Sequence, residues 1–106
     1  MKLYSLVMPL HNEVDGAGTV IREVVTALRA AGIPHEVVAI NDNSTDGTLE
    51  LLQNLSPQYP ELRVVNRTTP QGFGRAVRDG IAAARGEYVA IVMGDRSDDP
   101  KDIITY

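Results

Sequence analysis

Short apolar runs alternate with longer amphipathic stretches along the whole chain. Four apolar runs are almost continuous, which is typical of strands that are buried on both faces of a sheet. They predict strands over residues 3–9, 36–40, 62–66 and 87–93. Three stretches between them repeat apolar residues at helical spacing and predict helices over residues 19–31, 46–56 and 72–85.

Local signals mark where these helices begin and end. Gly32 ends the first helix, Asp46 is the expected N-cap of the second, and Gly86 follows the third. Pro100 is expected to begin a last helix as its first residue. The order is therefore β-α-β-α-β-α-β. It predicts an α/β fold of Rossmann-like type, in which a mostly parallel sheet of about four strands lies between helices in three α/β/α layers.

Length and composition narrow the possible classes of protein. The chain has 106 residues, which predicts one domain. Its net charge of −4 argues against a nucleic-acid partner, which would need clustered positive charge. The absence of cysteine excludes disulfide scaffolds, zinc–thiolate sites and cysteine nucleophiles, and it fits a reducing compartment. No apolar run approaches the roughly 20 residues of a membrane span, so we expect a cytoplasmic domain.

Polar loops follow three of the predicted strands. Ligands of parallel α/β sheets bind outside the carboxyl ends of the strands, which makes these loops the expected site. The loops cover residues 9–13, 41–47 and 94–100. The last is acidic, whereas residues 63–85 contain five arginines and one aspartate. A metal ion together with a diphosphate would fit such a separation of charge.

The acidic loop after the fourth strand is a candidate metal site. Asp95, Asp98 and Asp99 lie within five residues of one another, and Mg²⁺ and Mn²⁺ prefer oxygen ligands. The alternative is a solvated acidic turn in which Asp98 or Asp99 caps the following helix.

Other polar residues at this edge are candidates for nucleotide contacts. Asp42 follows a buried strand and is placed to accept hydrogen bonds from a base or ribose, or else simply to cap the next turn. Gly72 opens a helix whose N-terminus favours anions. Arg75 and Arg78 either face phosphate or are solvated on the helix surface. His11 is the weakest candidate, as a ligand or proton shuttle.

Four segments together resemble the family 2 glycosyltransferases, which have the GT-A nucleotide-sugar-binding fold. The segments are residues 5–13, 36–48, 72–76 and 85–88, the last running into Asp95 and Pro100. The branch that the chain resembles most is that of the polyprenyl (dolichyl) phosphate sugar transferases. The order and spacing of the segments agree with this family over nearly the whole chain.

The resemblance implies roles for particular positions. In this family the Pro-x-x-Asn-Glu loop lines the nucleotide pocket and the second acid of an Asp-Asp-Gly-Ser run contacts the base. The second acid of the family's Asp-x-Asp metal motif maps to Asp95. The nucleotide-binding residues that we expect are Pro9, Leu10, Asn12, Glu13, Asp42, Gly72, Arg75 and Gly94.

The chain departs from the family pattern at three positions. Asn41 and Asn43 stand where the Asp-Asp-Gly-Ser run has its first acid and its glycine. Met93 stands where the metal motif has its first acid, and a soft thioether does not suit Mg²⁺. Binding of the expected Mg²⁺ or Mn²⁺ therefore rests on Asp95, with Asp98 and Asp99 as further candidates.

Family catalytic domains are longer than this chain, and their second half carries the acceptor site. The resemblance thus implies that residues 1–106 are a donor-binding domain for a UDP- or GDP-linked sugar. The sugar would pass with inversion to a polyprenyl phosphate or another lipid or glycan acceptor. A phosphate acceptor needs little help from a base, since its second pKa is about 6, and we assign no catalytic residue. Oligomers and membrane association of a full-length enzyme fit this role. The alternative is a non-catalytic nucleotide-binding or regulatory module.

Overall fold

One sheet of five strands, in the order β3-β2-β1-β4-β5, organises the described residues. The computed structural model describes residues 2–94 and 104–105. The strands are β1 (Tyr4–Leu10), β2 (His35–Asp42), β3 (Leu62–Arg67), β4 (Tyr88–Ile91) and β5 (Ile104–Thr105). The first four are parallel, and β5 pairs antiparallel with β4. The predicted mostly parallel sheet is confirmed.

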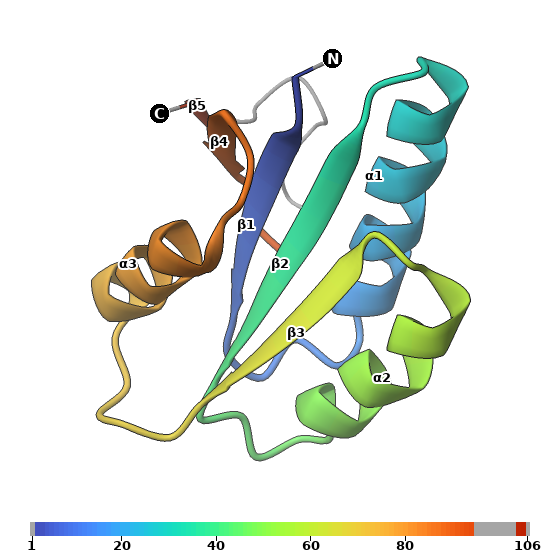
Figure 1. The fold of residues 1–106 in the computed structure, drawn as a ribbon. Helices are drawn as coiled ribbons and strands as arrows, with labels where there is room; N and C mark the ends of the chain where they lie inside the picture. Colours follow the sequence, from blue (N-terminus) through green and yellow to red (C-terminus); the bar gives the residue numbers. More distant parts are fainter. Residues whose placement is uncertain (1, 95–103, 106) are drawn as a thin grey trace.

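Helices cover both faces of the sheet, as the prediction of three layers requires. They are α1 (Ala17–Ala30), α2 (Thr48–Leu55) and α3 (Phe73–Ala83), and a short 3₁₀ helix, η1 (Ser56–Gln58), follows α2. Figure 1 shows α1 and α2 together on one side of the strands and α3 on the other. Each of the three helices connects two parallel strands, so the ends of the helices lie beside the ends of the strands.

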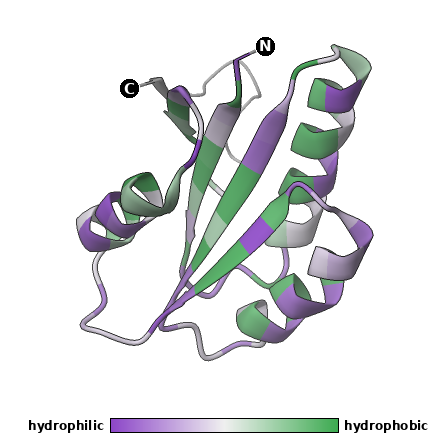
Figure 2. Cartoon of the chain, in the orientation of Figure 1, coloured by the Kyte–Doolittle hydropathy of each residue, from purple (hydrophilic) through white to green (hydrophobic). Residues whose placement is uncertain are grey.

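Alternate strand residues fill two separate cores. Leu6 and Met8 of β1 pack with α1 and α2 in the larger core. Val7, between them, packs with Ile40 and with Ala76 of α3 in the smaller one. Figure 2 shows hydrophobic residues along the central strands, between the helices on the two faces of the sheet. Every residue of β2 is buried, which explains why its middle, residues 37–40, is apolar without alternation.

The observed element ends differ from the predicted ones by a few residues. The first helix begins at Ala17, two residues earlier than predicted. The second begins at Thr48, with Gly47 at the cap in the left-handed region (φ 95°). Asp46, the predicted N-cap, precedes that cap, and its carboxylate still accepts the Thr48 N–H at 3.1 Å. The helix predicted from Pro100 lies outside the described residues.

The ion pair between Arg29 of α1 and Glu61 makes the fold sensitive to acid. Arg29 donates from Nε and a terminal nitrogen to the two Glu61 oxygens, at 2.6 and 2.7 Å. These hydrogen bonds lower the pKa of Glu61 to about 2 from its ordinary 4.5. A carboxylate with a lowered pKa stabilises the fold above its unfolded pKa, and this contribution is lost as pH falls.

We therefore expect the melting temperature to fall as pH is lowered from about 4.5 towards 2. Glu61→Gln should melt lower than the wild type at neutral pH and lose less between those two pH values. Thermal melts followed by circular dichroism across this range measure both effects. The control is Glu87→Gln, which removes an exposed carboxylate. Equal acid sensitivity of the Glu61 and Glu87 variants would contradict this assignment.

Candidate functional site

The strand order creates a crevice between β1 and β4. The chain steps outward from β1 to β2 and β3, and then returns to place β4 on the other side of β1. Paired Cα positions of β1 and β4 end at Val7 and Ile91, and the Val92 N–H still donates to the Val7 carbonyl at 2.9 Å. Pro9 follows on the same side of β1 and has no N–H to continue the ladder. Such a reversal of strand order is where ligands enter parallel sheets.

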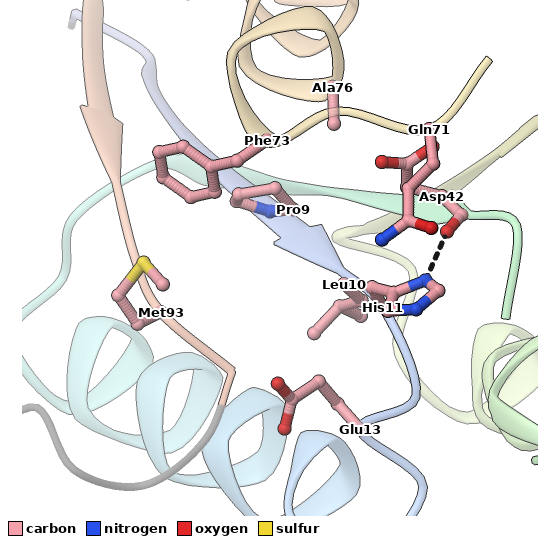
Figure 3. A pocket seen from close by; sticks show the side chains of 9 residues that line it. All are labelled: Pro9, Leu10, His11, Glu13, Asp42, Gln71, Phe73, Ala76 and Met93. Atoms are coloured by element: carbon pink, nitrogen blue, oxygen red, sulfur yellow. Dashed lines mark hydrogen bonds between the residues drawn. The ribbon is translucent and has the colours of Figure 1, made fainter.

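A pocket of about 130 Å³ opens at this place. Its lining comes from the end of β1 and the loop after it, the end of β2, the start of α3 and the segment after β4. The lining residues are Pro9, Leu10, His11, Glu13, Asp42, Gln71, Phe73, Ala76 and Met93. Figure 3 shows their side chains around one space. The pocket thus joins apolar walls to a small set of polar groups, as ligand sites commonly do.

Hydrogen bonds join the loops after β1 and β2 beside the pocket. The Asn12 side-chain oxygen accepts the Thr45 N–H at 2.7 Å, and the Asn12 N–H donates to Ser44 Oγ at 3.0 Å. The Glu13 N–H donates to Thr48 Oγ1 at 3.0 Å. Asn12 has a left-handed backbone (φ 54°), which asparagine tolerates better than most residues. Asn12 therefore holds the pocket rim in shape.

His11 is held in one orientation within the pocket wall. Its Nδ1–H donates to the Asp42 backbone carbonyl at 2.7 Å, a bond drawn in Figure 3. Since a carbonyl only accepts, the proton lies on Nδ1. In the neutral ring Nε2 then remains an acceptor, and Asn12 Nδ2 lies 3.3 Å from it. The ring thus links the ends of β1 and β2 and presents a fixed edge to the pocket.

The Asp42 carboxylate is buried and strongly hydrogen-bonded. Its Oδ1 accepts from Arg67 at 3.0 Å and from Asn43 Nδ2 at 2.9 Å, and its Oδ2 accepts the Gly72 N–H at 2.9 Å. Burial alone would raise the pKa of Asp42, but these hydrogen bonds and the Arg67 charge outweigh it and lower the pKa. Asp42 is therefore an anion that accepts hydrogen bonds.

The start of α3 forms the wall of the pocket opposite the loop after β1. Gly72 occupies the cap position of this helix and gives its N–H to Asp42. Phe73 lines the pocket although the residue is 57% exposed. An exposed phenylalanine beside a pocket offers apolar surface to a ligand.

The structure brings together half of the nucleotide-binding residues that the sequence predicts. Pro9, Leu10, Glu13 and Asp42 line the pocket. The other four, Asn12, Gly72, Arg75 and Gly94, do not. Asn12 is used in the loop and Gly72 binds Asp42.

Arg75 and Gly94, the two remaining residues, lie next to residues that line the pocket. Arg75 is exposed on α3, with its side chain beside Gly72. Gly94 is buried against Leu10, where a Cβ would overlap the leucine side chain. Its role in the described structure is to leave room for a pocket residue.

His11, the weakest candidate, lines the pocket, and so do Gln71 and Ala76, for which the sequence predicted no role. A histidine directly after a buried strand was a usable signal, because that position must face the carboxyl edge of the sheet. Gln71 and Ala76 gave no comparable signal, since only the packing of α3 brings them to the pocket.

The predicted metal ligands Asp95, Asp98 and Asp99 lie outside the described residues. Among residues 2–94 and 104–105, no three His, Cys, Asp or Glu side chains gather to hold a metal ion. Met93 lines the pocket, and its thioether is too soft for Mg²⁺. The described residues also include no helix long and apolar enough to cross a membrane.

Comparison with known proteins gives a consistent result. The family model described as "Glycosyl transferase family 2" matches residues 5–104. A dodecaprenyl-phosphate galacturonate synthase of Rhizobium johnstonii is 35% identical over 102 residues, which cover 93% of this chain and 30% of that protein. The chain thus spans about three tenths of the length of this relative.

Two solved structures are similar in fold and in sequence. TarS of S. aureus (residues 1–349), in complex with UDP-GlcNAc, has a TM-score of 0.75 and 26% identity, covering 90% of this chain and 27% of that one. The mannosyltransferase PcManGT of Pyrobaculum calidifontis, in complex with GDP-Man and Mn²⁺, has a TM-score of 0.68 and 26% identity. That match covers 87% of this chain and 27% of the other.

Proposed function

Because this chain belongs to glycosyl transferase family 2, we propose that it binds the nucleotide-diphosphate sugar donor of an inverting glycosyltransferase. The observation that carries this proposal is the pocket at the reversal of strand order, outside the carboxyl ends of β1, β2 and β4. Similar structures hold UDP-GlcNAc or GDP-Man. Residues 1–106 would thus form the donor-binding domain.

The nucleotide would lie against the described pocket residues. Asp42 accepts hydrogen bonds and would receive an N–H of the base, while Pro9 and Phe73 offer apolar surface to its ring. The α3 N-terminus and Arg75 lie next to the pocket and would favour the negative diphosphate. The other predicted contacts, Asn12, Gly72 and Gly94, would act through the shape of the pocket.

We further propose that a divalent cation, Mg²⁺ or Mn²⁺, accompanies the diphosphate. Asp95 would hold it, with Asp98 or Asp99 as further ligands, and PcManGT with GDP-Man and Mn²⁺ supports the choice of ion. The ion would neutralise charge on the departing diphosphate. The described residues contain no cluster of three His, Cys, Asp or Glu side chains that would hold the ion in place of these three.

The proposed acceptor is a polyprenyl phosphate, as the name of the Rhizobium relative suggests. A phosphate oxygen would attack the anomeric carbon from the face opposite the leaving group. One carbon–oxygen bond forms as the bond to the diphosphate breaks, and the nucleoside diphosphate departs with the bonding electrons. The configuration is thereby inverted. A phosphate monoester has a second pKa of about 6, so it is mostly the dianion at neutral pH and needs little activation by a base.

Met93 favours one second candidate function. It occupies a pocket position at which the family's metal motif has a carboxylate, so the pocket would also suit a module that binds nucleotide without transferring sugar. Sugar transfer from a UDP- or GDP-linked donor to a short polyprenyl phosphate, measured on the natural full-length protein, separates the two. Nucleotide binding without transfer would favour the module.

Titration calorimetry of the chain with UDP and GDP, with and without Mn²⁺, tests donor binding directly. We expect one nucleotide to bind, more tightly with Mn²⁺. Phe73→Ala should weaken that binding by about three- to tenfold, since the lost apolar contact is on the order of 1 kcal/mol. Ile81→Ala is the matched control, because Ile81 is also an exposed apolar residue of α3, at 39%, and does not line the pocket.

Two outcomes would contradict this assignment. The wild-type chain binding neither nucleotide under either condition would remove the proposed donor site. Equal affinities of the Phe73 and Ile81 variants would place the nucleotide away from the described pocket. Because both side chains are exposed, neither variant should lose enough stability to obscure the comparison.

A further inference from the structure

Arg67, the last residue of β3, connects three separate segments around the pocket. It donates to Asp42 Oδ1 at 3.0 Å, to Asp79 Oδ2 of α3 at 2.7 Å, and to the Pro70 carbonyl. Its side chain is only 7% exposed, and it does not line the pocket. A planar guanidinium with fixed N–H directions can hold three such acceptors at once.

These contacts determine how the Asp42 carboxylate is oriented and which hydrogen bonds it can still accept from a ligand. The carboxylate can accept about four hydrogen bonds, and Arg67, Asn43 and the Gly72 N–H take three of them. Arg67 also holds the Pro70 carbonyl, which lies in the turn that delivers Gln71 to the pocket. The guanidinium therefore fixes the orientation of Asp42 and the position of the turn together.

Stability alone is a poor reason for such an arrangement. Removing two charges from water costs free energy that their attraction often fails to recover, and apolar residues frequently serve a fold as well. The Arg67–Asp42 pair is almost fully buried, with side chains 7% and 4% exposed. Its position directly behind the pocket points to a role in geometry.

We propose that Arg67 is a positioning residue of the nucleotide site, acting through the Asp42 carboxylate and the turn at residues 68–72. This inference rests on the proposed donor binding. It predicts that changes at Arg67 reduce nucleotide affinity by more than their effect on stability explains.

Arg63, four residues earlier on β3, provides a matched control. It also donates to a β2 carboxylate, Glu36 Oε1 at 2.9 Å, and to a carbonyl next to it, Ala83 O at 2.8 Å. This pair lies at the amino edge of the parallel strands, away from the pocket. Arg63→Lys and Arg67→Lys thus make the same chemical change on the same strand at opposite ends.

The test is calorimetric titration of both lysine variants with UDP and GDP, at a temperature where thermal melts show each to be folded. We expect Arg67→Lys to lower the affinity by about tenfold, because lysine keeps the charge but loses the fork that orients a carboxylate. Arg63→Lys should stay within about twofold of the wild type, since a change remote from the pocket leaves the binding free energy nearly unchanged. Both should lower the melting temperature.

A structural readout accompanies the affinities. In ¹⁵N-edited spectra the Gly72 amide, which donates to Asp42, should shift and exchange faster in Arg67→Lys than in Arg63→Lys. If Arg67→Lys folds poorly, Arg67→Gln gives a neutral variant for the same comparison.

Three results would overturn the inference. Wild-type affinity in the Arg67 variants is the first, and equal losses of affinity in the Arg63 and Arg67 variants is the second. The third, no nucleotide binding by the wild type, overturns the proposed donor function as well, which distinguishes the two failures.

Discussion

Replacing Gly86 with alanine should lower the free energy of unfolding by about 3 kcal/mol, which is the upper part of the range for overpacking. Gly86 lies where the chain turns from α3 into β4, against the start of β1. A Cβ there would lie 2.6 Å from both the Leu3 carbonyl oxygen and Ser5 Oγ, and 2.9 Å from the Ser5 nitrogen. Two of these are backbone atoms, which cannot move aside as a flexible side chain can.

The consequences would spread through a buried network. The Gly86 N–H donates to Ser5 Oγ at 2.8 Å, and Ser5 Oγ donates to Glu36 at 2.6 Å. The Glu87 N–H donates to the Leu3 carbonyl at 2.9 Å. An added methyl group must push the turn away from β1, so these hydrogen bonds lengthen together and the buried Glu36 carboxylate loses support.

Thermal and urea unfolding of Gly86→Ala measure this effect, and a domain of this size should melt about 12–20 °C lower. Gly74→Ala is the control, because a Cβ at Gly74 would meet no heavy atom within 4 Å. Alanine favours a helix over glycine by up to about 1 kcal/mol, so Gly74→Ala should be neutral or stabilising. Equal stability of the two variants would contradict the argument.

The fold could be predicted from the sequence because burial on two faces leaves a strong pattern. β2 is buried along its whole length, so its middle, residues 37–40, is continuously apolar, with none of the alternation that a solvent-facing side would impose. The edge of the sheet that holds the pocket could be predicted for a related reason, since the carboxyl ends of parallel strands meet on one side. β5 was missed because two residues are too few to show a period.

Roles that depend on distant contacts could not be predicted. The basic residues between Arg63 and Arg85 suggested positive charge offered to a diphosphate. In the structure, two of those arginines are paired with carboxylates of β2. Sequence spacing does not reveal such pairing, because Arg67 and Asp42 are 25 positions apart. Asn12 is similar, since its partner Thr45 is 33 positions away.

The polar residues near the pocket fall into two groups, according to their hydrogen bonds. Of the polar residues at the carboxyl edge, Asn12 and Arg67 are used to hold loops, while His11, Glu13 and Asp42 line the space. The sequence does not distinguish the residues that hold loops from those that line the pocket. Only their hydrogen bonds in the structure do. Asp42 belongs to both groups, so it is the residue whose loss should matter most.

Asp42→Asn should reduce both stability and nucleotide binding. Without the carboxylate charge, the buried Arg67 loses its buried anionic partner and keeps the pair with Asp79, whose side chain is 48% exposed. Breaking one side of a buried ion pair typically costs about 3–5 kcal/mol. Nucleotide affinity should fall by at least about tenfold, since a hydrogen bond to a charged group contributes about 1.5–3 kcal/mol.

The double variant Asp42→Asn with Arg67→Met separates the two effects. It removes both buried charges, so it should regain much of the stability that Asp42→Asn loses, as replaced buried pairs often do. It should not regain nucleotide affinity, because neither the charged acceptor nor its positioning group is restored. Urea unfolding and calorimetry with UDP and GDP measure these two properties on the same samples.

Glu36→Gln is the matched control for Asp42→Asn, because Glu36 is the other buried carboxylate of β2 that pairs with an arginine of β3. Burial alone would raise the pKa of Glu36, but hydrogen bonds from Ser5, the Arg85 N–H and Arg63 lower it. Glu36→Gln should therefore also lose stability, yet keep nucleotide affinity within about twofold, since it lies at the edge opposite the pocket. Wild-type affinity in Asp42→Asn would remove Asp42 from the nucleotide site. A double variant no more stable than Asp42→Asn would instead show that the unpaired Arg67 charge is not the cause of the loss.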